Sequence, residues 1–277
     1  MNYKKLFTYL WLIFILLLTY HVVLYFTYNG TENIFNTVFN FAIAVVMVYG
    51  GIVGLWGLKQ VSMVSFQGRG LFFISLATLG LGIGFLISGF YPLLIGEELP
   101  YPSLADYVWL LFTVFNVLAY AYFLKIMKVS VTAKKVVTAI IIFLIAGAFV
   151  TYLIGYPSIS FESGLAFNES FFNFYYSISD LILIALSIII LSIAGGKIYK
   201  GLFIYNLGMI FQVIADVVFS YQIELGTAYD GDPADALYTI SGFLFSLGII
   251  ILIRDLSKRK EPQNLQNNQG YQQQVNQ

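Results

Sequence analysis

Eight long apolar stretches, separated by short polar segments, are the feature that most limits how this chain of 277 residues can fold. A helix needs about 20 mostly apolar residues to cross the hydrocarbon core of a bilayer. The stretches cover residues 6–28, 36–58, 70–91, 104–125, 136–155, 171–194, 201–223 and 234–254. Because backbone polar groups in lipid must be satisfied within their own segment, each stretch is expected to be helical. The sequence therefore predicts an all-α integral membrane protein with eight transmembrane helices.

The composition agrees with burial in lipid. Apolar residues make up 59% of the chain and charged residues only 10%, whereas about 25% of residues are charged in a typical soluble domain. The formal net charge is zero, so the charge balance does not indicate a nucleic-acid partner. The chain has no cysteine, which excludes disulfides, thiolate metal ligands and cysteine nucleophiles. The first partner we expect is the lipid bilayer.

The basic residues predict the orientation. All 14 fall on one side of the eight spans: Lys4, Lys5, Lys59, Arg69, Lys125, Lys128, Lys134, Lys135, Lys197, Lys200, Arg254, Lys258, Arg259 and Lys260. In the loops on the opposite side, the only charged residues are acidic. By the positive-inside rule the basic side is cytoplasmic, which predicts a multi-pass protein of the cell membrane with both termini in the cytoplasm. Two glycosylation sequons, at Asn29 and Asn168, fall on the outer side of this topology.

The chain reads as two copies of a four-helix unit in the same orientation. Residues 69–72 (Arg-Gly-Leu-Phe) match residues 200–203 (Lys-Gly-Leu-Phe), and other matches keep a similar offset of about 130. An even number of spans per unit inserts both copies with the same hand. We therefore expect a first repeat over 1–130 and a second over 131–256. A Gln/Asn-rich cytoplasmic tail over 257–277 is expected to be disordered.

Glycines predict close helix packing. Gly50, Gly54 and Gly57 mark one face of the second span, and Gly80 and Gly84 mark one face of the third. Small residues at this spacing let helix backbones approach each other. We expect the second and third helices to pack closely.

Ionisable residues within the spans are the candidate ligand or ion site. Asp180, Asp216 and His21 all fall roughly 10–15 Å below the outer surface at 1.5 Å of rise per residue. Gln212 lies one helical turn from Asp216. Charges inside a bilayer are costly and commonly functional. Three interpretations remain open: a cavity that responds to protons or cations, a ligand site of a sensor, and protonated acids that only hydrogen-bond between helices.

Two matching segments each predict a capped helix start. In the first, Ser103 is the expected N-cap and Asp106 the third helical residue; in the second, Asp232 and Asp235 take these places. A side-chain acceptor at the N-cap and an acid in the first turn satisfy free backbone N–H groups and the helix dipole.

The Pro-Ser-Leu-Ala-Asp segment at residues 102–106 also resembles a motif in prokaryotic membrane sensors. It is similar to the multi-pass region that precedes diguanylate cyclase, phosphodiesterase and histidine kinase domains. In that group a later loop, similar to residues 231–237 here, opens the last helix before the output domain. The resemblance implies a sensory role. Only the short polar tail follows Arg254, so a separate cytoplasmic or membrane protein partner is expected to carry the signal.

Three functions therefore compete. The first is a non-enzymatic sensor or signal-coupling module that acts through a partner, the second a small-solute or ion transporter built from parallel repeats, and the third a structural subunit of a membrane complex. The sequence offers no catalytic constellation, so we expect no enzyme activity, no catalytic residues and no cofactor. One histidine without cysteine does not predict a metal site.

Overall fold

The structure is a computed structural model that describes residues 1–28, 34–97, 99–126, 137, 141, 144–145, 148, 167–193 and 200–275. Within this part of the chain seven helices are long and apolar enough to cross a membrane. They are α1 (Tyr3–Tyr28), α2 (Ile34–Gly57), α3 (Phe66–Ile95), α4 (Leu104–Ile126), α6 (Phe167–Ile193), α7 (Lys200–Glu224) and α8 (Pro233–Val275). The all-helical prediction is confirmed for the described residues. The fifth predicted span, 136–155, lies mostly outside them, so eight spans and two repeats stay predictions.

Helix α3 is longer at both ends than the apolar stretch from 70 to 91. It begins after Ser65, whose Oγ accepts a hydrogen bond of 3.0 Å from the backbone N–H of Gly68. It ends at Gly96, which has a φ of 76° and donates its N–H to the Pro92 carbonyl at 3.0 Å. Glycine adopts this left-handed conformation without a steric penalty. Polar capping thus extends the helix into segments that hydropathy alone assigns to loops.

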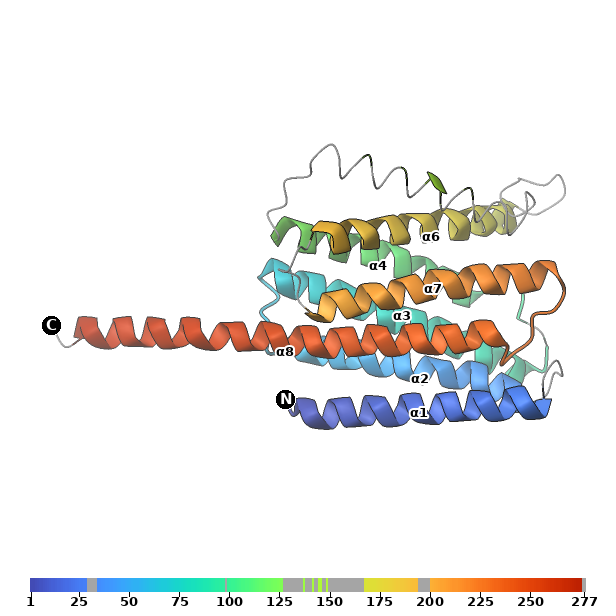
Figure 1. The fold of residues 1–277 in the computed structure, drawn as a ribbon, viewed down its shortest axis with the longest axis horizontal. Coiled ribbons are helices and arrows are strands. Elements are labelled where there is room, and N and C mark those ends of the chain that lie inside the picture. The colour runs from blue at the N-terminus through green and yellow to red at the C-terminus, as the bar shows by residue number, and fades with distance from the viewer. Residues whose placement is uncertain are drawn as a thin grey trace.

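Helix α8 continues past the membrane span, where a disordered tail was expected. The chain is helical to Val275, and this extension projects from one end of the bundle (Figure 1). Gln and Lys have good helix propensity, and adding a turn to an existing helix requires no new nucleation. The segment also contains Pro262, Gly270 and several asparagines, which are poor helix formers, so propensity alone does not account for the extension.

The helices form a bundle with α1 along one side and α6 along the opposite side (Figure 1). Among the described helices, α1 contacts only α2 and α8, whereas α6 contacts only α4 and α7. The most extensive pairs are α2 with α3, α7 with α8, and α3 with α4. Helix α8 also packs against α2, so it occupies the centre of the bundle.

The expected close packing of α2 and α3 is present: Gly54, one of the expected glycines, faces Ser75 of α3, and Gly51 and Gly89 add further close approaches. A Cβ atom at Gly51 would lie 2.6 Å from Leu79 Cβ, and one at Gly89 would lie 2.8 Å from Phe41 Cα. Gly50 and Gly57 instead face Ser246 and Ile253 of α8. The face marked by sequence spacing thus belongs mainly to the α2–α8 contact.

The two ends of the bundle differ in charge. The N-terminus and the α8 extension lie at the same end (Figure 1). We call it the basic end because it carries Lys4, Lys59, Arg69, Lys125, Lys200 and Arg254. The opposite, acidic end carries Glu97, Asp106, Glu169, Asp232 and Asp235.

Candidate functional site

The structure brings Asp180 and Asp216 together. Asp180 lies at the middle of α6 and Asp216 lies on α7, in the half of that helix nearer the acidic end. Their carboxyl groups lie close enough to influence each other electrostatically. Two carboxylates at close range repel, so the arrangement favours a proton shared between them. The two acids therefore form one carboxyl pair between α6 and α7.

Hydrogen bonds from α7 and α8 hold Asp216 in place. The hydroxyl of Tyr238 on α8 donates to Asp216 Oδ1 at 2.7 Å. Gln212 Nε2 lies 3.3 Å from both carboxyl oxygens, and Ser241 of α8 donates to Gln212 Oε1 at 2.7 Å. The Phe85 ring of α3 packs edge-on against Tyr238, with ring centroids 5.2 Å apart. Gln212 thus takes part in the site, as its spacing from Asp216 predicts.

Asp106 connects this pair to α4, a role that the sequence did not reveal. Its Oδ2 accepts bonds from the Ser103 backbone N–H at 2.6 Å and the Ser103 hydroxyl at 2.7 Å. Its other oxygen, Oδ1, accepts a bond of 2.6 Å from the hydroxyl of Tyr176. Tyr176 precedes Asp180 by one turn on α6, so the two side chains share a helix face. The Tyr176–Asp180 spacing was the available sequence signal for this link.

The second capped segment repeats the geometry of the first. Asp232 Oδ1 accepts bonds from the backbone N–H groups of Ala234 at 2.7 Å and Asp235 at 3.3 Å. Asp235 Oδ2 accepts a bond of 2.6 Å from the Gly231 N–H. Burial raises the pKa of Asp232, and these backbone bonds oppose that rise. Both segments therefore hold an acid against the first turn of a long helix.

Tyr101 precedes α4 at the acidic end of the bundle. Burial raises the pKa of Tyr101 to about 12, and the charges of Asp106 and Glu169 add to the rise. The phenol therefore keeps its proton at physiological pH. The starts of α4 and α6 lie close together at this end of the bundle.

His21 does not join the acids. It is 8% exposed on α1, and its ring lies 5.2 Å from the Phe39 ring of α2. Since α1 contacts neither α6 nor α7, His21 lies on another side of the bundle. Its Nδ1 atom makes no hydrogen bond to the described residues.

The two sequons have different positions. Asn168 is exposed and lies in the first turn of α6, whereas the sequence placed it in the loop before that helix. Asn29 lies outside the described residues.

A second polar cluster lies deeper in the bundle, and the sequence analysis missed it. Tyr205 of α7 donates to Asn116 Oδ1 of α4 at 2.8 Å, and Tyr120 of α4 donates to Asn206 Oδ1 of α7 at 3.0 Å. The Ser187 hydroxyl of α6 lies 3.2 Å from the Tyr120 hydroxyl. All five side chains are fully buried. Tyrosine and asparagine carry no charge at neutral pH, so charged residues within the spans do not point to this cluster.

The Asp180–Asp216 pair can exchange a proton or a cation. Loss of the shared proton would leave two negative charges in contact, and repulsion between them favours uptake of a proton or another cation. Within the described residues, no three His, Asp or Glu side chains gather in a group that could hold a metal ion.

Fold and site together define a multi-span helical membrane protein with a polar cluster between α4, α6, α7 and α8. No protein-family model, curated protein or solved structure matches the chain.

Proposed function

We propose that this chain is a non-enzymatic sensory or signal-coupling membrane protein whose ligand, a proton or a small cation, binds at the Asp180–Asp216 pair. The observation that carries the proposal is that side-chain contacts on either side of the carboxyl pair link four helices in turn. Asp106 and Tyr176 join α4 to α6, the carboxyl pair joins α6 to α7, and Tyr238 joins α7 to α8.

The orientation follows from charge. Under the positive-inside rule the basic end faces the cytoplasm of a cell membrane, together with both termini. The acidic end then faces outward, so a cation from outside reaches the carboxyl pair from the side that carries the acidic residues. The resemblance of residues 102–106 to a sensor motif agrees with this direction.

Helix α8 provides a route for the signal. Tyr238, near its start, bonds to Asp216, and the same helix continues through the bundle to Val275 beyond the basic end. A ligand shifts a conformational equilibrium only through its different affinity for two states. Replacing the shared proton by a cation changes the separation of α6 and α7 and therefore the position of α8. A cytoplasmic or membrane partner at the basic end would read that change.

The two-repeat architecture is part of the proposal. Helix α8 packs against α2, and α4 packs against α6. In a 4+4 arrangement these are equivalent contacts, because each joins the fourth helix of one half to the second helix of the other. The matching caps at Asp106 and Asp235 also support the duplication.

A transporter is the second candidate, and the deeper Tyr–Asn cluster favours it. Polar side chains recur on both helices, at Asp180 and Ser187 of α6 and at Asp216, Gln212 and Asn206 of α7. A solute path would require these groups near the middle of the membrane. In the structure the side chains of the Tyr–Asn cluster hydrogen-bond to each other, as expected for a fixed contact between helices.

Trp109 offers a test of the sensor proposal. Its ring lies 5.5 Å from Phe85, which in turn contacts Tyr238. Trp11→Phe with Trp56→Phe leaves Trp109 as the only tryptophan. We expect its fluorescence in lipid nanodiscs to titrate with pH and the midpoint to shift with added Na⁺. The titratable neighbours of the pair are Tyr175, Tyr176, Tyr238, Asp235 and Asp106.

Asp180→Asn with Asp216→Asn preserves hydrogen-bonding capacity and is expected to abolish this titration. Glu97→Gln is the matched control at the acidic end, and it should leave the titration unchanged. A titration that survives the double substitution would contradict the proposed ligand site. Transport of Na⁺ into sealed vesicles by the unmodified protein would favour the second candidate.

A further inference from the structure

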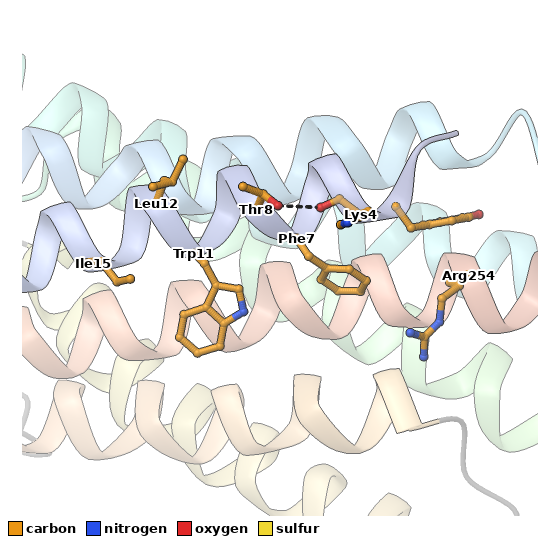
Figure 2. A pocket seen from close by; sticks show the side chains of 8 residues that line it. Lys4, Phe7, Thr8, Trp11, Leu12, Ile15 and Arg254 are labelled. Atoms are coloured by element: carbon orange, nitrogen blue, oxygen red, sulfur yellow. Dashed lines mark hydrogen bonds between the residues drawn. The ribbon is translucent and has the colours of Figure 1, made fainter.

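A groove runs between α1 and α8 at the basic end, far from the carboxyl pair. It has a volume of about 600 Å³ and is lined by Tyr3, Lys4, Phe7, Thr8, Trp11, Leu12, Ile15 and Arg254. Phe7 and Trp11 extend from α1 toward α8, and Arg254 extends from α8 beside the Phe7 ring (Figure 2). Its wall is therefore mainly apolar, with the two cations at one end.

The polar contacts of α1 fix the mouth of the groove. The Tyr3 hydroxyl bonds to Gln60 Oε1 at 2.5 Å and to Ser257 Oγ at 3.1 Å. Ser257 also donates to Gln60 Oε1 at 3.0 Å. These contacts join the start of α1 to the α2–α3 connection and to α8. The Thr8 hydroxyl donates to the Lys4 carbonyl at 2.9 Å (Figure 2), so it faces its own helix.

Arg254 has donors left for a ligand. Its Cζ lies 5.8 Å from the centroid of the Phe7 ring. Two of its N–H groups point to Asp255 Oδ1 at 3.2 Å, and a guanidinium has about five such donors. The side chain is 34% exposed. Lys4 is exposed at the same mouth, and Lys258 follows one turn later on α8, so cations outnumber the single acid.

We propose that this groove binds one anionic phospholipid, with the phosphate at Lys4 and Arg254 and an acyl chain along Phe7, Trp11 and Ile15. Basic pockets between transmembrane helices on the cytoplasmic side suit anionic headgroups. Under the orientation proposed above, the lipid belongs to the cytoplasmic leaflet. The site itself does not depend on the sensor function.

The length of the groove favours a lipid over another transmembrane helix. From Lys4 to Ile15 the wall of α1 spans about 17 Å at 1.5 Å per residue. One leaflet supplies about 15 Å of the 30 Å hydrocarbon core. A partner helix would contact α1 over its whole length, whereas an acyl chain ends near the midplane. The charges at one end and the apolar wall beyond them match the two parts of a lipid molecule.

Quenching of Trp11 tests the proposal. Trp56→Phe with Trp109→Phe leaves Trp11 as the only tryptophan. The full chain is purified in detergent and titrated with phosphatidylglycerol or phosphatidylcholine, each brominated on the acyl chains. We expect phosphatidylglycerol to quench Trp11 at lower mole fraction. Lys4→Gln with Arg254→Gln should raise the phosphatidylglycerol midpoint about tenfold and leave that of phosphatidylcholine unchanged.

Arg69→Gln is the matched control. Arg69 also lies at the basic end with its Cζ 5.8 Å from an aromatic centroid, that of Tyr122, but it does not line the groove. This variant should keep the preference for phosphatidylglycerol. Lys4→Gln alone changes an exposed side chain and should lower the preference about threefold, which keeps the test valid if the double variant does not fold.

Three results would overturn the proposal. Equal quenching by both lipids would show that the groove does not select charge. A preference that survives Lys4→Gln, or that Arg69→Gln lowers equally, would place the lipid elsewhere. Shielding of Trp11 from both lipids, with a dimer detected by crosslinking through α1, would identify a second copy as the occupant.

Discussion

The α2–α3 and α6–α7 interfaces take equivalent places in the proposed repeat, yet they are built in opposite ways. At α2–α3 the helices meet through glycines, with Gly51 against Leu79 and Gly89 against Phe41. At α6–α7 two carboxyl groups meet. Close backbone packing has one favourable arrangement, whereas a carboxyl pair has two, with and without its proton. The comparison suggests a rigid first half and a responsive second half.

Two residues that the proposed repeat aligns show the same contrast. Phe85 of α3 and Asp216 of α7 are separated by the repeat offset of about 131. Phe85 packs against the Tyr238 ring, and Asp216 accepts a hydrogen bond from the Tyr238 hydroxyl. One tyrosine thus contacts both halves of the molecule, so a change at Asp216 reaches the first half directly.

The largest expected effect comes from disturbing the rigid interface. Gly51→Ala places a Cβ 2.6 Å from Leu79 Cβ and 2.8 Å from the Leu79 backbone, so the two helices must separate. We expect a loss of about 3 kcal/mol in the free energy of unfolding, measured by thermal unfolding in detergent. Gly80→Ala on α3, where the nearest atom would lie 3.9 Å away, is the control. Equal stability of the two variants would contradict a rigid α2–α3 contact.

A smaller loss is expected at the carboxyl pair. Asp216→Leu removes the acceptor for Tyr238 and Gln212 and leaves Asp180 without its partner. Leaving buried polar groups unpaired should cost about 2 kcal/mol of unfolding free energy. Asp216→Asn retains an acceptor and should cost less than half as much. If the leucine variant is as stable as the asparagine variant, the cluster does not hold the helices together.

The sequence was sufficient to predict the seven described apolar helices but not the side-chain clusters. Long apolar segments fix where helices lie because lipid permits little else, and the caps at Ser103 and Asp232 are local patterns. Which side chains meet depends on helix rotation and neighbour choice, which no local pattern encodes. Depth along a helix suggested that His21, Asp180 and Asp216 could meet, but α1 packs on the opposite side of the bundle from α6. The extension of α8 to Val275 was not expected, because its Gln/Asn-rich sequence has no apolar periodicity.

The smallest expected effects are those of Tyr176→Phe and Tyr175→Phe, and comparing them separates a structural role of these side chains from a signalling role. Tyr176→Phe removes the bond from α6 to Asp106, and Tyr175→Phe removes a bond of 2.7 Å to the Leu110 carbonyl on the same neighbouring helix. Each should lower the free energy of unfolding by about 1 kcal/mol. Only Tyr176 links α6, the helix that carries Asp180, to Asp106 in the first turn of α4, the helix that carries Trp109.

Tyr176→Phe should therefore reduce the amplitude of the Trp109 fluorescence titration with little change in its midpoint. Tyr175→Phe, with the same loss of stability, should leave the amplitude unchanged. The remaining amplitude would pass through Tyr238 and Phe85, whose ring contacts Trp109 directly. If the amplitude is unchanged in both variants, that second route carries the whole response and the Tyr176–Asp106 bond serves only to position α4. The responsive unit would then reduce to α7, α8 and the aromatic contact with α3.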